Sequence, residues 1–323
     1  MDASLLLTNL LAPPILFFLL GVVASLVRAD LEFPQPVTRA LSLYLLFSIG
    51  LHGGCELAQA GIDRSVLAPL LGAVVASATI PLLVFLVLRR RLGADDAAAI
   101  AATYGSISAV TFITACSFLD ASQVSWSGTM VAAMALMESP AILIGVVLAR
   151  PSSGGALSGS FARLTREAFL NGPVFLLLGS LGVGLLAGEE GWAKVAPFAH
   201  EPFQGVLCLF LLDMGLLAAR RLDTLRSCGA FVIAFALVAP FAQAAVGIGL
   251  AYGLDLELGD ALLLTVLCAS ASYIAVPAAM RIVLPQANPS LYLPMALGLT
   301  FPLNVALGIP IYMTVLRFLW SPV

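Results

Sequence analysis

Two short runs of small polar residues interrupt otherwise apolar segments of this chain of 323 residues. The first run reads Gly105-Ser106-Ile107-Ser108 and the second reads Ser270-Ala271-Ser272-Tyr273. An interrupted helix presents a free N-terminus with unpaired N–H groups and a partial positive charge. Two such ends facing one cavity would bind an anion without an arginine. The four serine hydroxyls and that of Thr111 would bind an anion or a cation, or else bond within the helices.

Ionisable side chains inside apolar segments are the second candidate group. Glu138 lies in the fifth apolar segment, Asp213 lies in the seventh, and His52 is four residues before Glu56. A carboxylate at the bilayer centre costs at least about 2.5–3.5 kcal/mol, so it must be paired, protonated or bound to a cation. Glu138 is the preferred ligand for Na⁺, a hard ion that favours oxygen, and Asp213 is a further candidate. For both acids the alternative is a protonated side chain that bonds to a neighbouring helix.

The two polar runs lie at equivalent places in an internal repeat. The segment Ala94–Val147 aligns without a gap on Leu258–Ile311. An apolar chain that repeats itself and interrupts its helices at matching places is typical of a secondary transporter. The aligned pairs include Asp96 with Asp260, Ser106 with Ser270, and Ser108 with Ser272.

The composition requires a membrane protein. The chain is 61% hydrophobic and 10% charged, against about 45–50% and about 25% in soluble domains. No basic patch suits nucleic-acid binding. A membrane-spanning helix needs about 20 apolar residues, and the last apolar segment is long enough to bend at a proline. Ten spans are predicted, at Leu11–Val27, Val37–Ala58, Val66–Leu88, Ala97–Phe118, Trp126–Ala149, Ala168–Ala187, Phe203–Ala219, Gly229–Gly253, Asp260–Val283 and Leu291–Trp320.

A Ser/Gly-rich linker at residues 151–167 divides the chain into two halves, 1–150 and 168–323. Each half holds five predicted helices. Because five is odd, the second half must enter the membrane from the opposite side. The predicted fold is therefore an all-α polytopic membrane protein, with ten transmembrane helices in a five-plus-five inverted repeat and two broken helices that cross.

Lysine and arginine positions predict the orientation. Of the 15 basic residues, all except Arg64, Lys194 and Arg317 fall on one side of the predicted topology. Basic residues accumulate on the cytoplasmic side of membrane proteins. Both termini are therefore expected outside, in a multi-pass protein of the plasma membrane, which in bacteria is the inner membrane.

Several motifs together resemble the sodium-dependent bicarbonate permease family of the cyanobacterial type. They are Ala269–Arg281 with the following Ala287-Asn288-Pro289-Ser290, Phe47–Gly54, Gly105–Ser108, and Met137–Ala141. The resemblance extends from about the second helix to the last one. It implies Na⁺-coupled bicarbonate uptake by a homotrimer, with ten helices in an inverted repeat. It also implies a PII-like cytoplasmic regulator, although the linker here is shorter than in some members that the chain resembles.

The resemblance places the polar runs and Glu138 where the broken helices cross, and the residue types add Thr111 and Asp213 as cation candidates. Bicarbonate would be held by Ser106, Ser108, Ala109, Ser270, Ser272 and Tyr273. The coupling Na⁺ would be held by Ser108, Thr111, Glu138 and Asp213. No other cofactor is expected. Transport would proceed by alternating access, in which one helix bundle moves as a rigid body against the other.

Three alternatives stay open at this point. The cargo could be another small organic or inorganic anion, coupled to Na⁺ or H⁺. The chain could also be a membrane sensor or partner-binding protein that has the fold without transport. A membrane enzyme is disfavoured, because the sequence has no His-Glu-x-x-His motif and no credible Ser–His arrangement. The sequence contains no nucleotide-binding motif, so it does not indicate that ATP drives the protein.

Overall fold

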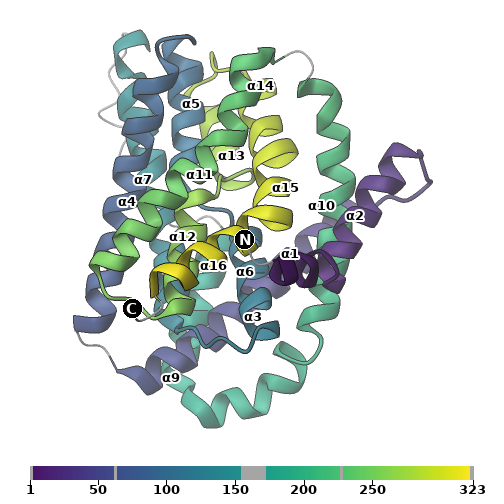
Figure 1. Cartoon of the computed structure of the whole chain (residues 1–323), viewed down its shortest axis with the longest axis vertical. Coiled ribbons are helices and arrows are strands. Elements are labelled where there is room, and N and C mark those ends of the chain that lie inside the picture. Colours follow the sequence, from purple (N-terminus) through teal and green to yellow (C-terminus); the bar gives the residue numbers. More distant parts are fainter. Residues whose placement is uncertain (1–2, 62–63, 154–171, 226–227, 321–323) are drawn as a thin grey trace.

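The computed structural model describes residues 3–61, 64–153, 172–225 and 228–320, and every regular element in these ranges is helical (Figure 1). The first half contains α1 (Ala3–Leu10), α2 (Pro13–Leu26), α3 (Gln35–Ala60), α4 (Arg64–Leu88), α5 (Ala94–Gly105), α6 (Ala109–Ala121) and α7 (Gly128–Ser153). The second half contains α9 (Gly172–Ala199), α10 (Phe203–Leu225), α11 (Gly229–Gly253), α12 (Leu258–Ala269), α13 (Ala275–Val283), α14 (Pro289–Pro294), η1 (Met295–Thr300), α15 (Phe301–Leu303), η2 (Asn304–Gly308) and α16 (Ile309–Trp320).

Eight helical stretches in the described ranges are long and apolar enough to cross a membrane. Two further predicted spans coincide with the shorter apolar helices α2 and α12. The first is short because a separate helix, α1, precedes Pro13, and the second is short because it ends before Ser270. The all-helical prediction is confirmed, while the count of ten spans stays a prediction.

The helix boundaries follow the apolar segments with a few corrections. The sixth predicted span ends at Ala187, yet α9 continues past a kink at Gly188 to Ala199. Gly188 has φ 59° and ψ −158°, a conformation that glycine adopts readily. The predicted linker begins at 151, but α7 runs through Ser153. The prediction ended the helix too early because hydropathy marks where the apolar residues end, and a helix can continue beyond them. Nearly all the rest of that linker falls in 154–171, outside the described residues.

The last predicted span is irregular where prolines were expected to bend it. The π-helical segments η1 and η2 start shortly after Pro294 and Pro302. Proline has no N–H to donate to the helix, so the hydrogen-bond pattern changes near it. The backbone carbonyls of Val305 and Ala306 in η2 accept hydrogen bonds from the side chain of Asn9, at 3.1 Å each. Helix α1 therefore supports this irregular segment.

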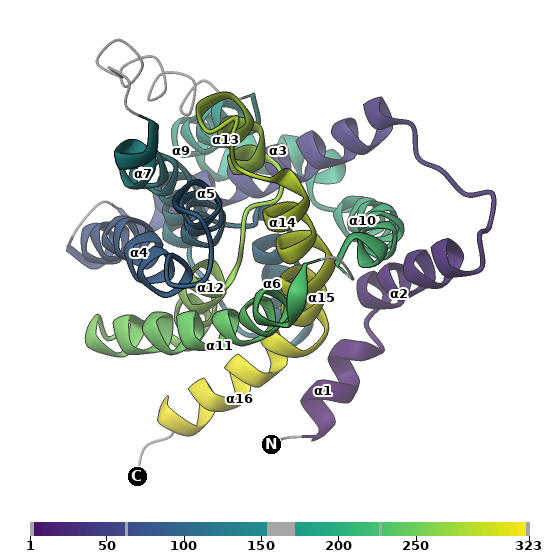
Figure 2. The ribbon, with the colours of Figure 1, turned by 90° about the horizontal axis from the view of Figure 1, so that it is seen from above.

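Two helix pairs flank the centre of the molecule: α2 packs along α10, and α3 packs along α9 (Figure 2). Glycines bring each pair into backbone contact. A Cβ atom at Gly21 or Gly215 would lie 2.1 Å from a carbonyl oxygen across the α2–α10 contact. At Gly54 and Gly184 in the α3–α9 contact, the distances would be 2.0 and 2.2 Å. Small residues permit such close approach between membrane helices.

The equivalent residues Asp96 and Asp260 make equivalent contacts. The Asp96 carboxylate accepts a hydrogen bond from the backbone N–H of Asn288, at 2.7 Å, just before α14. Asp260 accepts from the backbone N–H of Ser127, also at 2.7 Å, just before α7. Asp96 lies in the first turn of α5 and fixes the start of α14, the helix after the second interrupted helix. Asp260 lies in the first turn of α12 and fixes the start of α7, the helix after the first interrupted helix.

The interrupted helices occupy the interior. The stretch Ala94–Ala121 contains α5 and α6, and 94% of its most apolar 18 residues are buried in the protein. The alanines at 97–102 are fully enclosed, and their small side chains let neighbouring helices approach closely. The serines of both breaks are buried as well, and a non-helical backbone is tolerated inside a membrane where protein surrounds it.

Candidate functional site

The first break separates α5 from α6 at residues 106–108. Ser106 is extended, with φ −91° and ψ 174°. Ser108 caps α6: its Oγ accepts from the backbone N–H of Thr111 at 3.2 Å and from the Thr111 hydroxyl at 2.9 Å. At Gly105 a Cβ atom would lie 2.0 Å from the ring of Pro81, so only glycine fits there without displacement. Local capping and one close contact therefore define this break.

The second break separates α12 from α13 at residues 270–274 and repeats the first. Ser270 is extended, with φ −88° and ψ 169°. The Ser272 hydroxyl accepts from the backbone N–H of Val276 at 3.3 Å, as Ser108 accepts from Thr111. The prediction that both helices are interrupted at equivalent positions is confirmed.

The two breaks contact each other directly. The backbone N–H of Ser272 donates to the carbonyl oxygen of Thr103, at 2.9 Å. On the other side, the backbone N–H of Ser108 donates to the Ser270 hydroxyl, at 2.9 Å. That hydroxyl in turn donates to the carbonyl oxygen of Leu267, at 3.0 Å. Ser270 is therefore a bridge between the breaks, and its hydroxyl is already engaged.

Two buried amides occupy the carbonyl ends of the interrupted helices. Gln243 of α11 donates to the carbonyl oxygen of Tyr104, at 3.0 Å. Asn304 donates to the carbonyl oxygen of Ala269, at 2.8 Å, and accepts from the Tyr312 hydroxyl, at 2.7 Å. These carbonyls have lost their helical partners, and an unpaired buried carbonyl is costly. Neither amide was predicted as a site residue, although an amide in an apolar segment is itself a signal.

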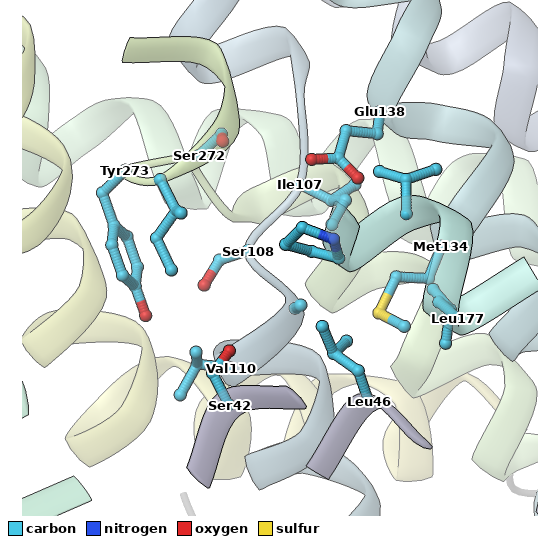
Figure 3. A pocket seen from close by; sticks show the side chains of 14 residues that line it. Ser42, Leu46, Ile107, Ser108, Val110, Met134, Glu138, Leu177, Ser272 and Tyr273 are labelled. Carbon is cyan, nitrogen blue, oxygen red and sulfur yellow. The ribbon is translucent and has the colours of Figure 1, made fainter. Parts of the chain in front are cut away.

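A cavity of about 60 Å³, here called the crossing cavity, adjoins the breaks (Figure 3). A water molecule needs only about 10–15 Å³ by this kind of measure, so a solute of a few heavy atoms fits. The polar groups on its wall come from α3, α7 and both breaks. They are Ser42, Ser108, Glu138, Ser272 and Tyr273.

The charges around the crossing cavity are complementary. Ala109 and Val110, the first residues of α6, line it, so the positive end of that helix faces the cavity. Glu138 reaches the same cavity from α7, and Figure 3 shows its carboxylate directed toward the side of Ser108. The cavity thus combines a partial positive end for an anion with carboxylate and hydroxyl oxygens for a cation.

Two hydroxyls at the breaks are buried without a hydrogen-bond partner among the described residues, those of Ser106 and Tyr273. Tyr273 and Ser108 both line the crossing cavity (Figure 3), but no hydrogen bond to the Tyr273 hydroxyl meets the normal distance and angle limits among the described residues. Buried polar atoms are normally satisfied by protein, water or a ligand. The Tyr273 hydroxyl is therefore free to bind a solute in the cavity.

The predicted site residues divide into three groups. Ser108, Ala109, Glu138, Ser272 and Tyr273 line the crossing cavity. Ser106, Thr111 and Ser270 belong to the breaks but are not on its wall. Asp213 lies elsewhere: it accepts a hydrogen bond from the Thr38 hydroxyl at 2.7 Å, which joins α10 to α3. Among the described residues, no group of three or more His, Cys, Asp or Glu side chains is arranged to hold a metal ion.

Comparison with known proteins adds a family to this geometry. No curated protein matches the chain. A family model described as the Na⁺-dependent bicarbonate transporter superfamily matches residues 13–317, which covers both interrupted helices and the crossing cavity. The chain, with its apolar helices and paired breaks, therefore belongs to the Na⁺-dependent bicarbonate transporter superfamily.

Proposed function

We propose that this multi-pass membrane protein takes up bicarbonate by coupling it to Na⁺. The family is one of transporters, so the chain is not an enzyme. The observation that carries the proposal is the crossing cavity, where the N-terminus of α6 and free hydroxyls face a single carboxylate, Glu138. Bicarbonate has four heavy atoms, which suits the small volume of that cavity.

The anion would bind at the start of α6. Backbone N–H groups at Ala109 and Val110 point out of a helix N-terminus and favour negative charge. The hydroxyls of Ser108 and Tyr273 would donate further hydrogen bonds, and Ser272 would close the site from the second break. Ser106 and Ser270 would act one step away, because they shape the backbone that presents these groups.

The cation would bind beside the anion at Glu138. Its carboxylate and the Ser108 hydroxyl supply oxygen ligands, and Thr111 orients Ser108 through their hydrogen bond. An adjacent cation and anion stabilise each other, so each ion would raise the affinity for the other. We assign Asp213 to holding α10 against α3 rather than to this ion, since it lies outside the cavity.

Coupling to Na⁺ is energetically reasonable. Moving one negative charge inward against the membrane potential costs about 2.3 kcal/mol per 100 mV. One Na⁺ cancels that charge, and a tenfold Na⁺ gradient adds about 1.4 kcal/mol. A symporter with one or more Na⁺ per bicarbonate can therefore accumulate its substrate without ATP.

We further infer ten spans in an inverted five-plus-five repeat. This is supported by the matched pairs α2–α10 and α3–α9 and by the matched contacts of Asp96 and Asp260. Alternating access would move the flanking bundle, which contains α2, α3, α9 and α10, as a rigid body against the helices that carry the breaks. The bacterial inner membrane, external termini, a homotrimer and a PII-like regulator complete the proposal.

Uptake of radiolabelled bicarbonate into proteoliposomes at fixed pH tests this function. The proposal expects uptake that needs an inward Na⁺ gradient and collapses when an ionophore dissipates it. A panel of small carboxylates and inorganic anions should compete poorly. Strong competition by another anion would change the assigned cargo, and the absence of any flux from intact inserted protein would contradict transport.

A further inference from the structure

A second cavity, of about 320 Å³, lies between α3, α6, α9 and the start of α10. It is here called the histidine cavity. The side chains that matter below are Ser48, His52, Trp126, Trp192 and His200. The His52 ring lies 4.9 Å from that of Trp192, 5.6 Å from that of Trp126 and 6.4 Å from that of His200, centroid to centroid. These aromatic rings form one wall of the cavity.

Helix α3 contributes to both cavities in sequence order. Ser42 and Leu46 line the crossing cavity, and Ser48 and His52, farther along the helix, line the histidine cavity. A helix rises 1.5 Å per residue, so from Ser42 to His52 the helix advances about 15 Å. The two cavities are therefore at different levels along α3.

Helices α6 and α9 show the same order. Val110 of α6 lines the crossing cavity, and Asp120 of α6 lines the histidine cavity. On α9, Leu177 lines the first cavity and Trp192 lines the second. Since three helices contribute to both cavities in a consistent direction, the cavities are successive parts of one space between them.

A thin apolar layer separates the two cavities. Leu46 and Ile49 are 5% and 4% exposed, and each belongs to the wall of one cavity. Close by, α3 meets α7: a Cβ atom at Gly53 would lie 2.6 Å from the side chain of Val131. This contact places the backbone of Gly53 against the Val131 side chain without a covalent or ionic link, so a shift of α3 relative to α7 would open it.

The histidine cavity contains buried polar atoms without partners. Ser48 is only 2% exposed, and neither its hydroxyl nor the Nδ1 atom of His52 has a hydrogen-bond partner among the described residues. Such atoms are expected to bind water or a solute. A hydroxyl and a neutral imidazole each offer one donor and at least one acceptor.

We propose that the histidine cavity is a second binding site for the transported oxyanion, at the outer end of the transport path. This inference rests on the proposed function. Bicarbonate carries one O–H donor and acceptor oxygens, which complement the Ser48 hydroxyl and the His52 imidazole. Asp120 and Glu201 also line this cavity and would repel an anion that entered alone, so the oxyanion would bind here together with Na⁺.

The kinetic test uses Ser48→Ala and His52→Phe in proteoliposomes, with Thr79→Ala as control. Thr79 bonds only within its own helix, to the carbonyls of Val75 and Ala76. Loss of one hydrogen bond to the solute should raise the KM for bicarbonate about 3- to 10-fold, with little change in kcat. Because the Ser48 hydroxyl has no partner, thermal stability should not fall. An unchanged KM in both variants would refute the second site.

A labelling test gives the side from which this cavity is reached. Ser48→Cys would be treated with a membrane-impermeant, anionic thiol reagent, with the wild type as control for its five buried cysteines. We expect modification from the outer side only, slowed by bicarbonate with Na⁺. Equal modification from both sides, or no protection, would contradict the inference.

The two proposals fail in distinguishable ways. Wild-type protein that transports bicarbonate with Na⁺, beside Ser48→Ala and His52→Phe variants that both have an unchanged KM, removes only the second site. Wild-type protein without any flux removes the proposed function, and the inference that rests on it falls too.

Discussion

Ser108 shows how one residue can shape a site and belong to it. Its Oγ caps α6 through Thr111, its backbone N–H reaches Ser270, and its side chain lines the crossing cavity. A capping serine is worth about 1 kcal/mol to a helix. Replacement of Ser108 would therefore alter both structure and binding, so Glu138 and Tyr273, which have fewer structural contacts, give clearer tests.

Glu138→Gln should weaken Na⁺ activation. The amide keeps the size of the side chain but removes the negative charge that favours a cation. We expect the Na⁺ concentration for half-maximal uptake to rise at least about tenfold, equivalent to about 1.4 kcal/mol. Uptake measured against Na⁺ checks this, with the exposed Glu190→Gln as control. Unchanged Na⁺ activation in Glu138→Gln would remove Glu138 from the cation site.

Tyr273→Phe should weaken bicarbonate binding without loss of stability. The hydroxyl has no partner to lose in the described part of the chain, so its removal affects only a bound solute. The KM for bicarbonate should rise about 3- to 10-fold, while the unfolding temperature in detergent stays the same. A lower unfolding temperature with unchanged KM would show instead that the hydroxyl is structural.

At the scale of elements, the breaks depend on side chains from other helices. Gln243 and Asn304 pair with carbonyls that the interrupted helices leave open. The glycines of α2, α3, α9 and α10 determine how closely the flanking pairs approach. Neither feature touches the proposed substrate, yet both hold the walls of the cavity in place.

Asn304→Asp should reduce transport by disturbing the second break. The substitution replaces an N–H donor with an oxygen that faces the Ala269 carbonyl, so a buried hydrogen bond becomes a repulsive contact. We expect a destabilisation of about 1–3 kcal/mol, seen as a lower unfolding temperature and as lost uptake. Tyr312→Phe removes only the supporting hydrogen bond to Asn304 and should lower the unfolding temperature and uptake less than Asn304→Asp does. An equal or larger loss in Tyr312→Phe would contradict the role given to Asn304.

Gly215→Ala should disrupt the contact between α2 and α10. The new methyl group would lie 2.1 Å from a backbone oxygen of α2, and such overpacking typically costs about 1–3 kcal/mol. Gly205→Ala on the same helix is the matched control, because no atom lies within 4 Å of a Cβ there. The temperature of thermal unfolding should fall for Gly215→Ala and stay unchanged for Gly205→Ala. Similar behaviour of both variants would mean that the helices separate easily.

At the scale of the whole molecule, charge and connectivity determine the topology. Twelve of the 15 basic residues fall on one side of the predicted ten-span arrangement, so we predict that this side is cytoplasmic. An even number of spans places both termini on the same side. This orientation determines which end of the protein would face external Na⁺ and bicarbonate in the proposed function.

Protease-cleavable tags at the two termini test the orientation in intact cells. We expect external protease to remove both tags, while a tag inserted next to Arg90 stays protected. Removal of one terminal tag but not the other would contradict an even number of spans. Protection of both would reverse the assigned orientation.

Local patterns predicted much of the helical structure and part of the site. Gly229–Gly253 was predicted with the observed boundaries, because an apolar run between turn residues defines a helix locally. The breaks at Ser106 and Ser270 were predicted because the repeat places the same polar pattern at both. The end of α9 was not predicted, since Gly188, Glu189 and Glu190 interrupt the apolar run although the helix continues beyond them.

The sequence by itself determined the membrane setting, the equivalent breaks and the acids that must find a partner in an apolar interior. Only the tertiary structure decided which acid faces the breaks. Glu138 reaches the crossing cavity, while Asp213 bonds to Thr38. Local propensity acts over a few residues, whereas these contacts join residues far apart in the chain. The need of a buried polar group for a partner is readable from sequence, but the identity of that partner is not.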